Sequence, residues 1–141
     1  MTIRAVKAII ILNKRYLLQL RDKKKNISFP NHWGLFGGRV DKKEINTNAL
    51  VREIKEETNL KIKIKRKILD VNFNVLGLKK KRNLEYFECK IVGKKNILLS
   101  EGKKYNFFSF KQIKRLNIVP MDFVALKSHF LYNNSFISIY R

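Results

Sequence analysis

Cysteine is nearly absent from this chain of 141 residues, with Cys89 as its single representative. One cysteine cannot form a disulfide within the chain, and a zinc site built mainly from cysteine is excluded. Long hydrophobic runs are also missing, because Lys7 interrupts the apolar stretch near the N-terminus, MTIRAVKAIIILNKR. No small-residue cleavage site follows that stretch. That stretch is too short to span a membrane and has few features of a signal peptide. We therefore expect a cytoplasmic protein with no membrane partner.

Acidic residues are scarce, with 11 Asp and Glu against 32 Lys and Arg, which gives a formal charge of +21. So large an excess favours an anionic partner such as a nucleotide, a nucleic acid or an acidic lipid surface. An AT-rich genome offers a second explanation, because Lys, Asn and Ile are all abundant. Charge alone does not choose between them, and binding of nucleic acid through a basic surface stays open.

No repeat, low-complexity linker or second domain is visible, and apolar residues make up 45% of the chain, enough to form a core. We expect one domain over residues 1–141, as a monomer or a homodimer. Alternating apolar and polar side chains between turn residues predict strands over residues 5–12, 16–20, 60–64, 68–76, 84–92 and 105–110. The first two should form a hairpin through Asn13-Lys14, and a basic turn over 79–82 should join the fourth and fifth.

Two helices are predicted between and after these strands. The first covers residues 47–58 with Asn46 or Thr47 as its N-cap, and the second runs from Pro120 to about Tyr132. Strands followed by a helix, twice over, predict an α/β fold in which helices cover both faces of a mixed sheet. The side chains expected to pack the first helix on the sheet are Thr47, Leu50, Val51, Ile54 and Thr58.

Three of the few acidic residues gather on another face of that first helix. Glu53, Glu56 and Glu57 fall at i, i+3 and i+4, where like charges repel by about 0.2–0.5 kcal/mol per pair. The cluster therefore needs a compensating positive charge. A solvated helix face would supply it through an i,i+4 ion pair from Arg52 to Glu56. The alternative is a hard divalent cation such as Mg²⁺, which takes oxygen ligands and binds together with substrate phosphates.

A fixed spacing joins these acids to the segment WGLFGGRVDKKE at residues 33–44. Gly38 is followed after five residues by Glu44, and after seven more by the run REIKEE at residues 52–57. The paired glycines Gly37 and Gly38 predict a bend that brings a bare backbone carbonyl close to a ligand.

This spacing closely resembles the Nudix box, G-x5-E-x7-R-E-U-x-E-E-x-G-U with U aliphatic, and six of its seven glycine or polar positions match. Asn59 replaces the last glycine. Since Asn is the next best residue in the left-handed conformation that ends a helix, we expect a small loss of stability and no loss of chemistry.

The resemblance implies a Nudix-type α/β/α sandwich and a Nudix hydrolase that cleaves the phosphoanhydride bond of a nucleoside diphosphate linked to another group. It identifies Glu53, Glu56 and Glu57 as ligands of Mg²⁺, with Mn²⁺ as a substitute, and implies that the Gly38 carbonyl and Glu44 complete or orient that shell. Such ions neutralise a diphosphate and lower the pKa of a bound water.

The remaining roles that the resemblance implies concern proton transfer and the support of the acids. Arg52 steadies the acids through hydrogen bonds, with a surface ion pair as the alternative. Glu53 is the first candidate for the general base that accepts the proton of the attacking water. Glu101 is the second, unless it is simply a turn residue beside Gly102.

Further residues are candidates for substrate binding. Arg21 resembles a position that contacts phosphate, and Gly37 belongs to the predicted bend. Trp33 and Phe36 would either stack on a base or pack beside the glycines. Asp122 would hydrogen-bond a base, or is an acid favoured by the dipole of its helix.

The expected substrate is a nucleoside triphosphate or a nucleotide-sugar type diphosphate. Two alternatives remain: hydrolysis at the 5′ end of RNA, and a non-catalytic nucleic-acid-binding module on the same fold. Clustered carboxylates argue against the second, because a phosphate-binding module has no use for them without a metal.

Overall fold

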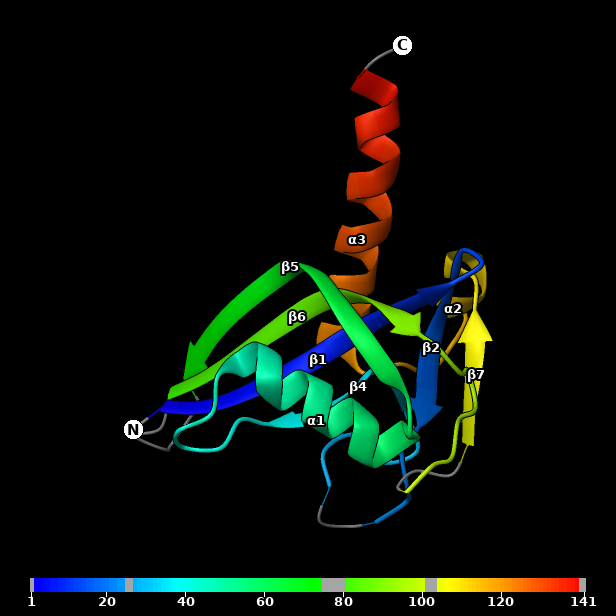
Figure 1. The fold of residues 1–141 in the computed structure, drawn as a ribbon. Helices are drawn as coiled ribbons and strands as arrows, with labels where there is room; N and C mark the ends of the chain where they lie inside the picture. The colour runs from blue at the N-terminus through cyan, green and yellow to red at the C-terminus, as the bar shows by residue number, and fades with distance from the viewer. Residues whose placement is uncertain (1, 25–26, 75–80, 101–103, 140–141) are drawn as a thin grey trace.

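The computed structural model describes residues 2–24, 27–74, 81–100 and 104–139, with side chains up to residue 132. Its elements follow one another along the chain as Figure 1 shows. They are β1 (Thr2–Leu12), β2 (Arg15–Leu20), β3 (Trp33–Gly34), β4 (Phe36–Arg39), α1 (Asn46–Thr58), β5 (Lys61–Asn74), β6 (Lys81–Val92), β7 (Lys104–Phe108), α2 (Phe110–Ile113) and α3 (Pro120–Ile139).

β1 is the central strand of the sheet. It pairs in parallel with β6 and antiparallel with β4, and its last residues pair antiparallel with β2. Within the described ranges the strand order is β3-β2-β1-β6-β5, with β4 beside β1 and β7 beside β2. The predicted mixed sheet is therefore confirmed, and so is the hairpin, whose turn residues Asn13 and Lys14 both have positive φ.

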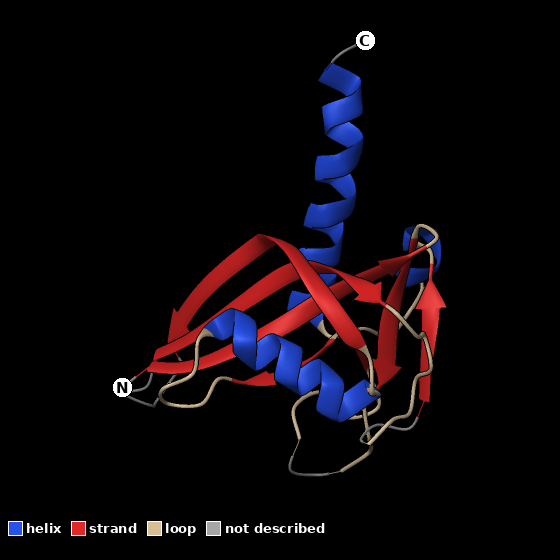
Figure 2. Ribbon diagram, in the orientation of Figure 1, coloured by secondary structure: helices blue, strands red, loops and turns tan. Residues whose placement is uncertain are grey.

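Each face of the sheet has its own core. Val6, Ala8 and Ile10 of β1 pack with Leu50 and Ile54 of α1. On the opposite face, Ile9 packs with Tyr86 of β6 and with Leu126 of α3. This alternation follows from the two-residue period of a strand. Figure 2 shows α1 lying across the sheet and α3 rising beyond it, so the expected α/β/α layering is confirmed.

β5 is one long strand where the sequence predicts two. Residues 61–74 stay paired with β6. Bulges between Ile64 and Arg66, and between Lys67 and Leu69, let the pairing continue through the charged residues that separate the two predicted strands. Residues 75–76 of the predicted strand and the first part of the predicted turn over 79–82 lie outside the described residues.

The start of α1 differs from the prediction. Its N-cap is Ile45, which makes no side-chain capping bond, and neither Asn46 nor Thr47 takes that role. The Asn46 side chain is used elsewhere, since its Oδ1 accepts a hydrogen bond from Arg4 Nη1 at 2.7 Å and its Nδ2 donates to Glu85. Val51 is exposed, and Ala49 is buried against the core in its place.

The end of α1 agrees with the prediction. Asn59 has a left-handed conformation with φ of 65°, and its N–H donates to the Lys55 carbonyl at 2.9 Å. The substitution for glycine in the box therefore keeps the backbone turn that the box requires.

Phe110 begins α2 and does not end the preceding strand. The Ser109 side chain accepts a bond from the Gln112 N–H, and the Gln112 side chain accepts one from the Ser109 N–H. This reciprocal capping has a recognisable sequence signature, Ser-x-x-Gln, so α2 was predictable. The last helix, α3, begins at Pro120 as predicted and extends to Ile139. No helix in the described ranges combines the length and the apolar character needed to cross a bilayer.

Candidate active site

Gly37 and Gly38 lie in strand β4, so the predicted bend is wrong, and neither has a positive φ. A Cβ at either position would meet a close neighbour, which is backbone at Gly37 and the end of a side chain at Gly38. At Gly37 it would collide with the Val6 carbonyl oxygen and lie 2.7 Å from Lys7 Cα. At Gly38 it would lie 2.5 Å from Oε2 and 2.7 Å from Oε1 of Glu53. The glycines thus allow β1 and a helix carboxylate to approach β4 closely.

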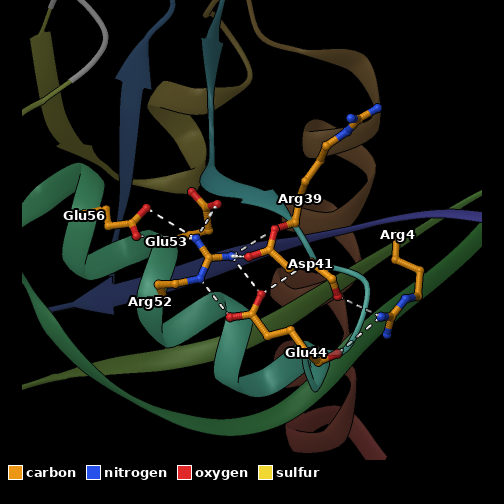
Figure 3. Close-up of polar contacts among 7 residues, drawn as sticks. All are labelled: Arg4, Arg39, Asp41, Glu44, Arg52, Glu53 and Glu56. Atoms are coloured by element: carbon orange, nitrogen blue, oxygen red, sulfur yellow. Dashed lines mark hydrogen bonds and ion pairs between the residues drawn. The ribbon is translucent and has the colours of Figure 1, made fainter.

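Arg52 forms hydrogen bonds to three carboxylates of the site (Figure 3). Its Nε and Nη2 each donate to the Glu44 carboxylate at 2.8 Å, which makes a bidentate pair. Its Nη1 donates to Glu53 Oε1 at 3.0 Å and to Glu56 Oε2 at 3.3 Å. Nη2 also donates to the Arg39 carbonyl at 3.3 Å, while the Arg39 side chain points away from the cluster. Helix α1 is thereby tied to the end of β4 and to the loop that follows it.

The ion pair expected for a solvated helix face is present, but it is weaker than the pair with Glu44. Glu56 is more than half exposed, and it lies farther from Arg52 than Glu44 does. Arg52 is directed mainly at Glu44, which the sequence places eight positions earlier and outside α1.

Glu44 is strongly stabilised as a carboxylate. Hydrogen bonds from the Arg52 side chain, and next from the Asp41 N–H, lower the pKa of Glu44 to about 2. The bonds to Glu44 raise the pKa of Arg52 in turn, so both partners stay charged. The Arg4 guanidinium stabilises the loop between β4 and α1, because it donates to the Glu44 carbonyl at 3.2 Å. This loop therefore holds Arg52 in a fixed position.

The lowered pKa of Glu44 predicts sensitivity to acid. The folded chain binds the proton with a pKa of about 2, below the ordinary 4.5, so the unfolded state takes up the proton first as pH falls. The stabilisation from Glu44 should be complete above the ordinary pKa and be lost as pH falls through the folded value. Urea unfolding of wild type and Glu44→Gln would measure this, and the difference in unfolding free energy should shrink from about pH 6 to about pH 2. A difference that stays constant over that range would contradict the prediction.

Glu57 is buried, and it lines a cleft of about 580 Å³ together with Gly37, Gly38, Arg39 and Arg21. Over the part of the chain that the structure describes, no three His, Cys, Asp or Glu side chains stand close enough to hold a metal ion. The donors nevertheless have the right chemistry, since carboxylates and a backbone carbonyl are the hard oxygen ligands that a divalent cation prefers. The absent Cβ of Gly38 leaves the space into which the Glu53 carboxylate reaches.

A second cleft of about 480 Å³ lies between β1, β6 and the start of α3. Its lining is largely apolar and includes Leu84, Val119 and the exposed rings of Phe29 and Phe73. No pattern in the sequence distinguishes these two aromatic residues. Phe73 lies opposite Arg82 in the β5–β6 register. An exposed aromatic residue paired with a cation across two strands is a combination that favours an anionic ring-containing ligand.

Asp122 has no exposed surface for a base to reach. Its Oδ1 accepts bonds from Tyr86 Oη at 2.6 Å and from Lys7 Nζ at 2.8 Å. Its Oδ2 accepts bonds from Lys7 Nζ and the Leu35 N–H, both at 2.9 Å. The carboxylate is fully buried and already accepts four hydrogen bonds, which favours a place in the wall of the cleft over contact with a base.

The aromatic residues beside the glycines are packing residues. Phe36 is fully buried in the core under α1. Trp33 packs edge-to-face on Phe108, with ring centroids 4.8 Å apart. Neither residue lines either of the two clefts, which favours the packing alternative for both.

Arg21 follows β2 and lines both clefts. Its Nε donates to the Ser28 carbonyl at 2.8 Å, which fixes the direction of the side chain. The other candidate for the general base, Glu101, lies outside the described residues.

A model of the NUDIX domain matches residues 1–127 of this chain. The m7GpppN-mRNA hydrolase NUDT17 of Xenopus laevis is 40% identical over 67 residues, which are 48% of this chain and 20% of that protein. This chain thus spans about a fifth of the length of that relative.

Solved structures agree in fold over nearly the whole chain. The E. coli ORF135 protein superposes with a TM-score of 0.80 and 22% identity over 95% of this chain and 92% of that one. The MutT protein from Methanosarcina mazei Go1 superposes with a TM-score of 0.75 and 26% identity, over 94% of this chain and 95% of that one. With the box residues placed on β4, on α1 and in the loop between them, this chain belongs to the Nudix family.

Proposed function

We propose that this chain is an Mg²⁺-dependent pyrophosphohydrolase that cleaves the diphosphate linkage of a nucleoside diphosphate joined to a further group. A nucleoside triphosphate or a nucleotide-sugar type compound is such a substrate. One observation carries the proposal: two unlike clefts meet along β1. One contains Gly38, Glu57 and cations, and the other is apolar with two exposed aromatic rings. A nucleotide has the same two halves, a charged phosphate chain and an apolar base.

The residues that would hold the metal are Glu53, Glu56 and Glu57, with the Gly38 carbonyl beside them. Nudix proteins generally use divalent metal ions, and oxygen donors of this kind suit Mg²⁺ and also Mn²⁺. A bound ion would neutralise phosphate charge and lower the pKa of a water in its shell.

The chain's own side chains would do the rest. Glu53 would accept the proton of the attacking water, because its carboxylate lies against Gly38, a residue that lines the cleft. Arg52 would keep Glu53 and Glu56 in place, while its bidentate bond to Glu44 fixes Arg52 itself. Arg21 and Arg39 would bind phosphate oxygens.

A panel of nucleotides incubated with Mg²⁺ tests the proposal directly. The panel should include nucleoside triphosphates, nucleotide sugars and dinucleoside polyphosphates, with products identified by mass spectrometry in isotopically labelled water. We expect at least one compound to yield a nucleoside monophosphate and a phosphorylated remainder, with the label on one product and no reaction in EDTA. Absence of turnover across the panel with both Mg²⁺ and Mn²⁺ would refute it.

Hydrolysis at the 5′ end of RNA is the second candidate. The curated relative is named as an mRNA cap hydrolase, and β5 exposes Lys61, Lys63 and Lys65 along the edge of the sheet. If RNA is the substrate, 5′-triphosphorylated or capped RNA should outcompete free nucleotides, and KM should rise steeply with salt as phosphate contacts are screened. RNA binding without product formation would instead favour a non-catalytic module.

A further inference from the structure

Lys7 lies where the two clefts meet. Four residues line both of them, and three of the four are cations: Ala5, Lys7, Arg21 and Arg39. Lys7 occupies the middle of β1, and 19% of its side chain is exposed. In the sequence this residue only interrupts an apolar run. In the fold it stands between the cleft of the box residues and the apolar cleft.

The Lys7 ammonium group is held in one place. Its Nζ donates to both carboxylate oxygens of Asp122, at 2.8 Å and 2.9 Å, and Asp122 is itself fully buried. The Tyr86 hydroxyl and the Leu35 N–H hold that carboxylate from the other sides. Burial raises the pKa of Tyr86, so its hydroxyl remains a donor.

Two glycines make room for this pair. Gly37 faces Lys7 in the β1–β4 register, and a Cβ there would lie 2.9 Å from Lys7 Cγ. A Cβ on Gly34 would lie 3.0 Å from Asp122 Oδ2. Gly37, the residue before the box, therefore leaves space for a lysine side chain as well as for the β1 backbone.

The ammonium retains capacity for a ligand. It carries three N–H donors, and its bonds to Asp122 use at most two of them. Arg21 is similarly oriented by its bond to the Ser28 carbonyl. Three cations with fixed or cleft-directed side chains at one junction match a phosphate group, whose oxygens accept several charge-assisted hydrogen bonds at once.

We propose that Lys7 binds the phosphate group next to the nucleoside, together with Arg21 and Arg39, and that Asp122 positions Lys7 for this contact. The inference rests on the proposed function, because a nucleotide spanning both clefts places that phosphate at their junction. Lys7 is then a substrate-binding residue, and Asp122 is a positioning residue that never touches the substrate.

Binding of nucleoside monophosphates and of the matching nucleosides, measured by calorimetry in EDTA, isolates this contact from metal and from turnover. AMP, CMP, GMP and UMP serve as probes. Wild type should bind at least one monophosphate more tightly than its nucleoside. Lys7→Met should weaken the binding of that monophosphate by about 10- to 100-fold, as expected for the loss of a charge-assisted hydrogen bond. The affinity for the nucleoside should be unchanged. Lys111→Met, the same substitution at an exposed position of α2, is the matched control and should change neither affinity.

Lys7→Met leaves the buried Asp122 carboxylate without its ammonium partner and is expected to unfold more easily. The double variant Lys7→Met/Asp122→Asn removes that charge and should fold, with monophosphate affinity as low as in the single variant. Asp122→Asn alone keeps the ammonium but loosens it, so its monophosphate affinity should fall between wild type and the double variant.

Three results would overturn the inference. They are wild-type monophosphate affinity in the double variant, equal affinity of wild type for monophosphates and nucleosides, and no binding of any probe by wild type. None of these measurements requires catalysis, so they separate this inference from the hydrolysis test. A chain that binds monophosphates through Lys7 but hydrolyses nothing would retain this inference and lose the proposed function.

Discussion

Glu53→Gln is expected to lower kcat by about 10²- to 10⁴-fold, the range typical for loss of a general base. The glutamine amide cannot accept a proton from water, and it removes one negative charge from the metal-binding acids. Its oxygen can still accept the hydrogen bond that Arg52 Nη1 donates to Glu53 at 3.0 Å, so the free energy of unfolding should change little. The measurement is kcat for the best substrate of the nucleotide panel, with urea unfolding as the test of folding.

Glu88→Gln is the matched control for that variant. Glu88 is equally sheltered, with 14% of its side chain exposed against 19% for Glu53. It also has a basic partner, since it accepts a bond from Arg66 Nε at 3.2 Å, and it contacts His129 Nε2 at 2.9 Å. Its partner His129 lies on α3, away from Arg52, so the substitution should reduce stability and leave kcat unchanged.

Two outcomes would change the assignment of Glu53. A kcat within about twofold of wild type, far below the range for a lost base, would exclude it as the base and return attention to Glu101. If a higher Mg²⁺ concentration restored full kcat in Glu53→Gln, Glu53 would be a metal ligand only, because added metal cannot replace a missing proton acceptor.

The acidic face of α1 was predictable because a helix fixes the angle between successive residues. Once α1 is assigned from its apolar residues, the positions of Glu53, Glu56 and Glu57 follow from their numbers alone. The bidentate bond from Arg52 to Glu44 was not derivable in that way. The loop between β4 and α1 brings those residues together, and only the resemblance to the Nudix box connected them.

Contacts across long sequence separations account for most of what the sequence did not reveal. Lys7 and Asp122 lie 115 positions apart, and they meet only because α3 begins beside β1 and β6. Asn46 reads as an N-cap by local preference, yet its amide bonds to Arg4 and Glu85 on two different strands. In both cases a tertiary contact decides the role of a residue whose local sequence suggests another.

Alanine at Gly37 and alanine at Gly38 should fail in different ways, although the two residues are adjacent. At Gly37 the new Cβ would meet the Val6 carbonyl of β1, and the central strand cannot shift without moving the sheet. We expect the free energy of unfolding to fall by about 3 kcal/mol, the upper part of the range for overpacking.

At Gly38 the new Cβ would meet the Glu53 carboxylate, which belongs to a side chain that can rotate away. Stability should therefore stay close to wild type, while kcat falls by about 10- to 100-fold because the displaced carboxylate leaves the position that Arg52 holds. Gly93→Ala controls for backbone effects alone, since a Cβ there meets nothing within 4 Å and the φ of 77° costs about 1–2 kcal/mol. Urea unfolding and kcat of the three variants separate the two roles. If Gly38→Ala lost as much stability as Gly37→Ala and kept its kcat, Gly38 would serve strand packing alone and the approach of Glu53 to β4 would have no part in the chemistry.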